Sequence, residues 1–215
     1  MRCTTVAVLL WLTGGLAMAI EEPDYRVVER YPEFELRQYP PYLVAETEID
    51  AGFDKAGNLA FRILAGYIFG DNRRSEKIDM TAPVSQRPDD AGGETIDMTA
   101  PVSQRPKSAA DADSGYVVSF VMPAHYTRET LPEPKDPRVR IRERPERLMA
   151  ARRYSGRWTE ANYRDNERRL LTAVRDTGLR PVGPPVYARY NSPFSLWFLR
   201  RNEVMVEVER PEKSD

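Results

Sequence analysis

Residues 42–67, with the sequence YLVAETEIDAGFDKAGNLAFRILAGY, contain the change of hydrophobic period that decides the fold class. Tyr42–Ile49 is rich in β-branched and aromatic residues and follows two prolines, a pattern typical of a strand. From Phe53 onward the apolar residues recur every three or four positions, which predicts one apolar stripe of a helix. Gly70 ends that helix. The segment therefore predicts a strand that leads directly into an amphipathic helix.

The same kinds of element recur along the rest of the chain. The predicted strands are Tyr25–Glu29, Phe34–Tyr39, Tyr42–Ile49, Tyr116–Met122, Val139–Glu143, Arg147–Tyr154, Val186–Tyr190 and Val204–Val208. Thr159 is the predicted N-cap of a second helix that ends at Gly178. This order predicts an α+β fold, a distorted antiparallel β-barrel or curved sheet from two similar halves, each with one long helix. No linker separates the halves, so residues 20–215 are predicted to form a single domain.

An exact repeat follows the first helix. The sequence IDMTAPVSQRP occupies residues 78–88 and again residues 96–106. Apolar and polar residues alternate within each copy, which predicts two half-buried strands, and Ala91-Gly92-Gly93 between them is suited to a hairpin turn. Proline removes a donor from the hydrogen-bond ladder, so these strands are expected at a sheet edge or to end near Pro83 and Pro101.

Residues 1–19 have the features of a secretory signal peptide. A basic start is followed by an apolar run from Val6 to Leu16, and Ala17-Met18-Ala19 suits signal peptidase. The run is shorter than the roughly 20 apolar residues of a membrane-spanning helix. We therefore predict cleavage after Ala19 and a periplasmic or secreted protein without membrane attachment. The alternative is an uncleaved N-terminal anchor.

Composition excludes several classes of function. The chain has 32 Lys and Arg residues against 33 Asp and Glu residues, so it lacks the basic field that a nucleic-acid partner requires. Cys3 lies in the signal segment and is the only cysteine, which leaves the cleaved chain without disulfides or thiolate chemistry. With one histidine, no Ser-His-Asp or metal-spaced set can be placed, and no enzymatic activity is expected.

Several segments together resemble the SOUL/haem-binding family, in order over nearly the whole cleaved chain. The matching segments are residues 25–39, 77–84, 119–123, 131–132, 154–156 and 188–204. Bacterial members often carry the motif of residues 77–84 twice, as this chain does, which implies a bacterial source. The resemblance implies a barrel-like α+β fold and a hydrophobic pocket beside the first helix that binds haem non-covalently, without an obligatory axial ligand. The same superfamily fold resembles domains of multidrug regulators and some hydrolases, so fold alone does not decide function.

The resemblance directs attention to the first helix and the segment after it. Haem is a flat apolar ring with two carboxylates at one edge, so its site needs an apolar slot with cations at the mouth. The candidate slot residues are Leu59, Ile63, Leu64 and Tyr67, with Met80 and Val84 as further lining; the candidate cations are Arg73, Arg74 and Lys77. The competing interpretation is that the apolar residues are ordinary core and the basic residues are solvated.

His125 is the only candidate imidazole ligand for haem iron. It lies in Pro123-Ala124-His125-Tyr126, where the segment reads as an irregular loop and family members more often have lysine. We expect an exposed loop residue rather than an iron ligand. Met80 and Met98 are soft candidate ligands, but an inward methionine on a strand is usually a packing residue.

Three functions remain open from the sequence. The first is an exported haem-binding protein for storage, buffering or transfer of the tetrapyrrole. The second is a binding module for another amphipathic small molecule, which would use the same pocket. The third is a small hydrolase with Glu46 or Glu48 as general base, for which no paired catalytic group is identifiable. The sequence indicates no particular protein partner.

Overall fold

The computed structural model describes residues 21–73, 94–107, 115–191 and 194–210. Its strands are β1 (Arg26–Arg30), β2 (Glu35–Tyr39), β3 (Tyr42–Ile49), β4 (Asn72–Arg73), β5 (Val102–Pro106), β6 (Tyr116–Val121), β7 (Glu133–Pro134), β8 (Arg140–Arg144), β9 (Arg147–Tyr154), β10 (Arg180–Arg189) and β11 (Asn202–Glu209). The helices are α1 (Phe53–Ile68), α2 (Glu160–Asp176) and the short 3-10 helix η2 (Trp197–Leu199). Both long helices lie where the sequence predicts them. The predicted signal segment lies outside the described residues.

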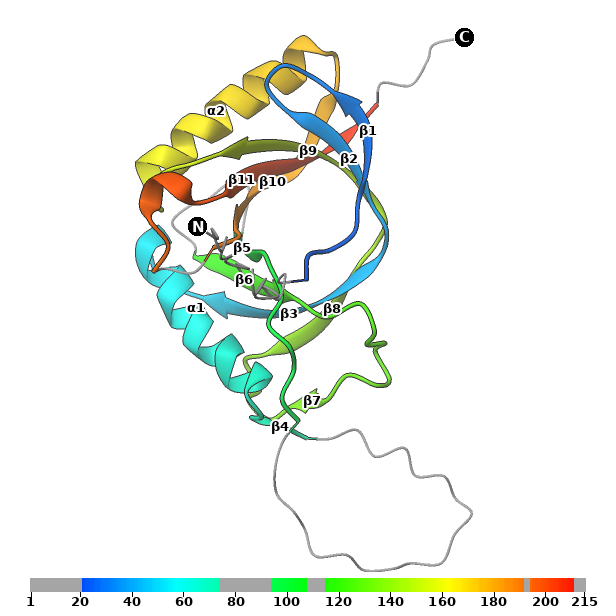
Figure 1. Ribbon diagram of the computed structural model, residues 1–215, viewed down its shortest axis with the longest axis vertical. Coiled ribbons are helices and arrows are strands. Elements are labelled where there is room, and N and C mark those ends of the chain that lie inside the picture. The colour runs from blue at the N-terminus through cyan, green and yellow to red at the C-terminus, as the bar shows by residue number, and fades with distance from the viewer. Residues whose placement is uncertain (1–20, 74–93, 108–114, 192–193, 211–215) are drawn as a thin grey trace, which may run out of the picture.

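Nine strands form one antiparallel sheet in the order β1-β2-β9-β11-β10-β5-β6-β3-β8, while β4 and β7 pair separately. Figure 1 shows the large sheet strongly curved, with α1 and α2 on its outer side. In the part of the chain that the structure describes, the end strands β1 and β8 do not pair with each other. The α+β prediction is confirmed, and the curved sheet rather than the closed barrel is the form observed.

Each helix covers one half of the convex face. α1 packs on β3 and β6, and α2 packs on β9, β10 and β11. The core between α1 and the sheet includes Ala45, Leu64, Val118 and Phe120, and the core between α2 and the sheet includes Leu36, Leu170, Val204 and Val206. Leu64 is fully buried, and burial of a leucine side chain contributes about 1.5–3 kcal/mol.

The concave face of the sheet has a small core of its own. Because successive side chains of a strand point to opposite faces, the strands that bury one set of residues under the helices turn the other set inward. The inward set includes Tyr39, Met149, Ala151, Ala188 and Met205. The structure therefore has two apolar cores beneath helices and a third on the concave face of the sheet.

The second repeat copy differs from its prediction. Residues 96–101 do not form a strand: Met98 is exposed where alternation predicts an inward side chain, and Thr99 is buried. β5 begins only after Pro101, and it lies inside the sheet between β10 and β6 rather than at an edge. The edge alternative was wrong for this copy, whereas a strand boundary does fall at Pro101: β5 starts after this proline, which therefore removes no donor from the ladder. The residues before it find other partners; the Ala100 N–H donates to the Glu21 carbonyl. The first copy, residues 78–88, lies outside the described residues.

Among the described residues, no helix has both the length and the apolar character required to cross a membrane.

Candidate ligand-binding surfaces

α1 buries one stripe of side chains against the sheet and leaves a flank accessible. Leu64 and Tyr67 are buried, whereas Leu59 is 39% exposed and Ile63 is half-buried. The helical period of 3.6 residues separates these two sets around the helix axis. The Tyr67 hydroxyl donates to the Pro132 carbonyl at 2.8 Å, which fixes that ring within the core.

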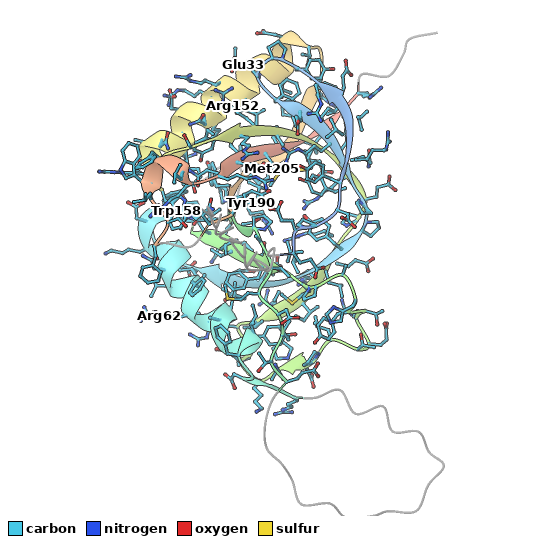
Figure 2. The ribbon with its side chains drawn as sticks, viewed as in Figure 1. Glu33, Arg62, Arg152, Trp158, Tyr190 and Met205 are labelled. Carbon is cyan, nitrogen blue, oxygen red and sulfur yellow. The ribbon has the colours of Figure 1, made fainter. Side chains whose placement is uncertain are left out.

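An open cavity of about 520 Å³ lies along the accessible flank, and we call it the α1 groove. Its lining residues are Ile49, Leu59, Arg62, Ile63, Gly66, Asp71, Asp136 and Arg138. Arg138 Nη2 lies 2.6 Å from Asp136 Oδ2, and its hydrogen bonds lower the pKa of that carboxyl group. Figure 2 shows Arg62 on the outer side of α1. Arg62 has no carboxylate within ion-pair distance in the described part of the chain.

The sequence prediction and the observed groove overlap in part. Leu59 and Ile63 line the groove, while Leu64 and Tyr67 lie beneath it in the core. Arg73 is exposed on β4 and is not a groove residue. The remaining predicted site residues, Arg74, Lys77, Met80 and Val84, lie outside the described residues.

Two arginines of the groove were not predicted. Arg62 follows Leu59 by one helical turn, so the helical period itself carried the signal that places both on one flank. Arg138 reaches the groove from a segment about 70 residues further along the chain. No local pattern in the sequence could assign it to α1.

His125 is exposed and its ring lies 4.2 Å from that of Tyr126, between centroids. It is not among the residues that line the α1 groove. Met98 is exposed and is likewise absent from that lining.

A second apolar surface, the 194–199 loop, was missed by the sequence reasoning. Its exposed apolar residues are Phe194, Leu196, Trp197, Phe198 and Leu199. Phe194 is 96% exposed, and exposed apolar clusters of this kind typically mark interaction sites. Figure 1 shows η2 beside the ends of α1 and α2 that lie closest together. The unbroken apolar run Leu196–Leu199, which fits neither a strand nor a helix period, was the available signal.

Arg189 joins the two helices next to this loop. Its guanidinium lies over the rings of Phe53, Trp158 and Tyr163, and its Nε donates to the Tyr163 hydroxyl at 3.2 Å. A Cβ atom on Gly57 would come within 2.9 Å of Arg189 Nη1, so glycine permits this close approach. Trp158 is labelled in Figure 2, and the Arg200 guanidinium carbon lies 4.2 Å from the centroid of its ring.

The concave face contains a buried charge network. Arg37 Nη1 lies 2.8 Å from Glu203 Oε2, and both side chains are almost fully buried. The Tyr190 hydroxyl donates to Glu203 at 2.8 Å, and Arg201 Nη2 lies 3.0 Å from the other carboxylate oxygen. Figure 2 shows Tyr190 and Met205 on the inner side of the curved sheet. Every oxygen of this buried carboxylate therefore has a donor.

The two glutamates considered as catalytic bases are both ion-paired on this face. Glu46 Oε2 lies 2.5 Å from Arg144 Nη2, and Glu48 Oε1 lies 3.2 Å from Arg140 Nη1. The described residues contain no group of three or more His, Cys, Asp or Glu side chains suited to a metal ion.

The family model described as SOUL heme-binding protein matches residues 20–207. This chain belongs to the SOUL heme-binding protein family. Among relatives of this family, heme-binding protein 2 of Mus musculus is 26% identical over 211 residues, covering 90% of this chain and 93% of the relative. Heme-binding protein 2 of Homo sapiens is 27% identical over 210 residues, covering 90% and 92%.

Solved structures share the fold of this SOUL chain at much lower identity. The C-terminal domain of EcmrR superposes with a TM-score of 0.59 at 12% identity, covering 87% of this chain and 99% of that domain. A protein described as a hydrolase from Listeria innocua gives a TM-score of 0.52 at 14% identity, covering 85% and 94%. At such identities the likeness shows the fold alone.

Proposed function

We propose that this protein binds haem non-covalently in the α1 groove. The observation that carries the proposal is the accessible flank of α1, where apolar side chains and arginines share one open cavity in a chain of the SOUL heme-binding protein family. The names of the mouse and human relatives, which refer to haem binding, support the same ligand.

The groove residues fit the shape and polarity of the group. A cavity of about 520 Å³ lies within the roughly 300–1,000 Å³ that ligand sites typically occupy. Leu59, Ile63 and Ile49 offer apolar contacts to a flat ring, and Arg62, which has no ion-pair partner among the described residues, can donate to a propionate. Haem supplies the visible absorption by which its binding can be followed.

Iron ligation has no role in this proposal. Among the described residues that line the groove, none is a histidine, cysteine, methionine or tyrosine. Affinity then comes from ring contacts and from the propionates, which is compatible with reversible exchange.

The open groove favours a function in storage, buffering or transfer, since a partly exposed ligand can pass to another acceptor. We further propose that residues 1–19 are removed and that the domain works in the periplasm or outside the cell, as the N-terminal pattern predicts. In this proposal the protein is not an enzyme, it has no nucleic-acid partner, and it is not attached to a membrane after cleavage.

Absorption titration with haemin tests the proposal. Leu59→Glu places a charge against the ring, and we expect a loss of affinity of about tenfold or more from lost apolar contact and desolvation of the carboxylate. Arg62→Glu reverses the charge that faces a propionate, and we expect haemin affinity to fall several-fold. Arg168→Glu is the matched control, because it makes the same change of charge at an exposed position on α2, away from the α1 groove.

The 194–199 loop is the second candidate location, favoured by its exposed aromatic residues. Haemin affinity that falls in Trp197→Ser but not in Leu59→Glu would move the site to this loop. A parent chain that gives no shifted Soret band at near-stoichiometric haemin would contradict haem binding altogether. A thermal-shift response to another amphipathic molecule would then favour the alternative ligand class.

A further inference from the structure

A group of arginines converges on a small cavity in the concave face, away from the α1 groove. The cavity has a volume of about 40 Å³, and its lining includes Arg105, Arg144 and Arg147 with Tyr42, Ser103 and Ser119. Tyr42 is opposite Arg144 in the β3–β8 pair, and Ser103 is opposite Ser119 in the β5–β6 pair. Glu46, on the same face of β3 as Tyr42, is opposite Ser119 in the β3–β6 pair. Because side chains directly opposite on an antiparallel pair share a face, the register places Tyr42, Arg144, Ser103 and Ser119 on the same inner surface.

Positive charge in this cluster exceeds the carboxylate available to it. Glu46 is shared by three guanidinium groups: Arg144 at 2.5 Å, Arg142 at 3.7 Å and Arg105 at 3.9 Å. Burial lowers the pKa of Arg105, and the charge of Arg144 lowers it further. Like charges are therefore crowded together on the inner face of the sheet.

Arg147 adds a donor that has no acceptor in the described structure. Its Nη2 donates to the Tyr42 hydroxyl, but its buried Nε has no hydrogen-bond partner. A buried donor without a partner is costly, which makes such groups rare in folded proteins. The Tyr42 hydroxyl keeps its own proton for donation to a ligand.

The size of the cavity limits what it can hold. At about 10–15 Å³ for each water, 40 Å³ has room for about three waters, which suits a carboxylate and excludes a tetrapyrrole ring. Pro23, Tyr42 and Val121 also line a neighbouring cavity of about 510 Å³. That outer cavity contains apolar residues, including Leu43, Met122 and Pro123.

We propose that the concave cavity binds the carboxylate of an aliphatic monocarboxylic acid, with the acyl chain in the outer cavity. Arg105, Arg144 and Arg147 hold the carboxylate, and the Tyr42 hydroxyl donates a further hydrogen bond. The site lies on the opposite face of the sheet from α1 and does not rest on the proposed haem function.

The outer cavity adds selectivity for a single negative charge. Its lining includes the carboxylates of Glu21, Glu22, Asp24, Glu129 and Glu143 and one arginine, Arg128; Glu22 is also paired with Arg201 Nη1 at 2.8 Å. A second carboxylate at the far end of the acyl chain would lie near these groups and be repelled. Decanoate should therefore bind more tightly than decanedioate.

Calorimetric titration of the full chain tests the site with decanoate as the probe. Decanol and decyltrimethylammonium are the neutral and cationic comparisons. We expect measurable binding for decanoate and at least about tenfold weaker binding for both comparisons, because neither offers an anionic acceptor to the guanidinium groups. Equal affinity for decanoate and decanol would overturn the proposal, since it would show binding by the acyl chain alone.

Two substitutions separate binding from stability. Arg105→Gln and Arg147→Gln should each weaken decanoate binding about tenfold, while Arg105→Gln leaves the melting temperature unchanged or raised because like-charge crowding is relieved. Arg168→Gln, an exposed arginine on α2, is the charge-matched control. Decanoate affinity equal to the parent in both variants would overturn the assignment.

The two proposed sites can fail independently. Leu59→Glu should leave decanoate affinity unchanged, and Arg105→Gln should leave haemin affinity unchanged. A decanoate affinity that falls in Leu59→Glu would place the acid in the α1 groove and contradict the concave site.

Discussion

Glu203 is the residue at which a small chemical change should have the largest effect on stability. Glu203→Gln keeps the shape of the side chain but removes its charge, so Arg37 stays buried opposite a neutral amide. The amide NH₂ group, itself a donor, must then replace a carboxylate oxygen that accepts hydrogen bonds from neighbouring donors such as the Tyr190 hydroxyl or Arg201. Breaking a buried ion pair by changing one partner typically costs about 3–5 kcal/mol. For a domain of this size that corresponds to a fall in melting temperature of about 6–20 °C. The loss is a large fraction of a total stability of about 5–15 kcal/mol.

Urea unfolding followed by circular dichroism measures the effect, and Glu209→Gln is the control. Glu209 lies on the same strand, but its pair with Arg180 is exposed, so the same change should cost about 1 kcal/mol or less. Equal losses for the two variants would refute the reasoning, because burial would then have no influence on the cost.

Two further outcomes are expected. Burial raises the pKa of Glu203, but hydrogen bonds and charge from Arg37 outweigh burial and hold the pKa below its ordinary value. The ionised carboxylate therefore stabilises the fold above about pH 4.5, and this stabilisation is lost as pH falls through the folded-state pKa. The difference in unfolding free energy between parent and Glu203→Gln should shrink in acid, and a difference that stays constant with pH would contradict this expectation. Thr159→Ala should cost about 0.5–1 kcal/mol in urea unfolding, since the Thr159 hydroxyl accepts from Asn162 N–H at a long 3.4 Å, and no loss would show that this cap is energetically neutral.

The sequence was sufficient for the helices because their signals are local. The apolar stripe that begins at Phe53 lies within α1, and the N-cap at Thr159 belongs to α2 alone, so each signal can be read without knowledge of tertiary contacts. Residues 96–101 show the opposite case. Their alternation predicts a strand, yet the backbone donors of Ile96 and Ala100 bond to α1 and to the N-terminal segment instead.

The lining of the α1 groove was predictable only where it comes from one helix. Leu59 and Ile63 follow from the period of α1, and Arg62 follows from the same period, although the sequence reasoning did not use it. Arg138 and the convergence of Arg105, Arg144 and Arg147 depend on which strands pair. No local sequence pattern determines the order of the strands, so the positions of these arginines relative to one another and to α1 could not be assigned from the sequence.

The proposed position of haem, on the outer flank of α1, can be tested directly. Backbone amide NMR of the isotopically labelled protein, recorded with and without haemin, locates the bound group because its paramagnetic iron broadens nearby signals. We expect loss of the amide signals of residues 59–66, while those of Tyr42 and Arg144 on the concave face persist. Broadening confined to the concave face, or spectra unchanged by haemin, would contradict it.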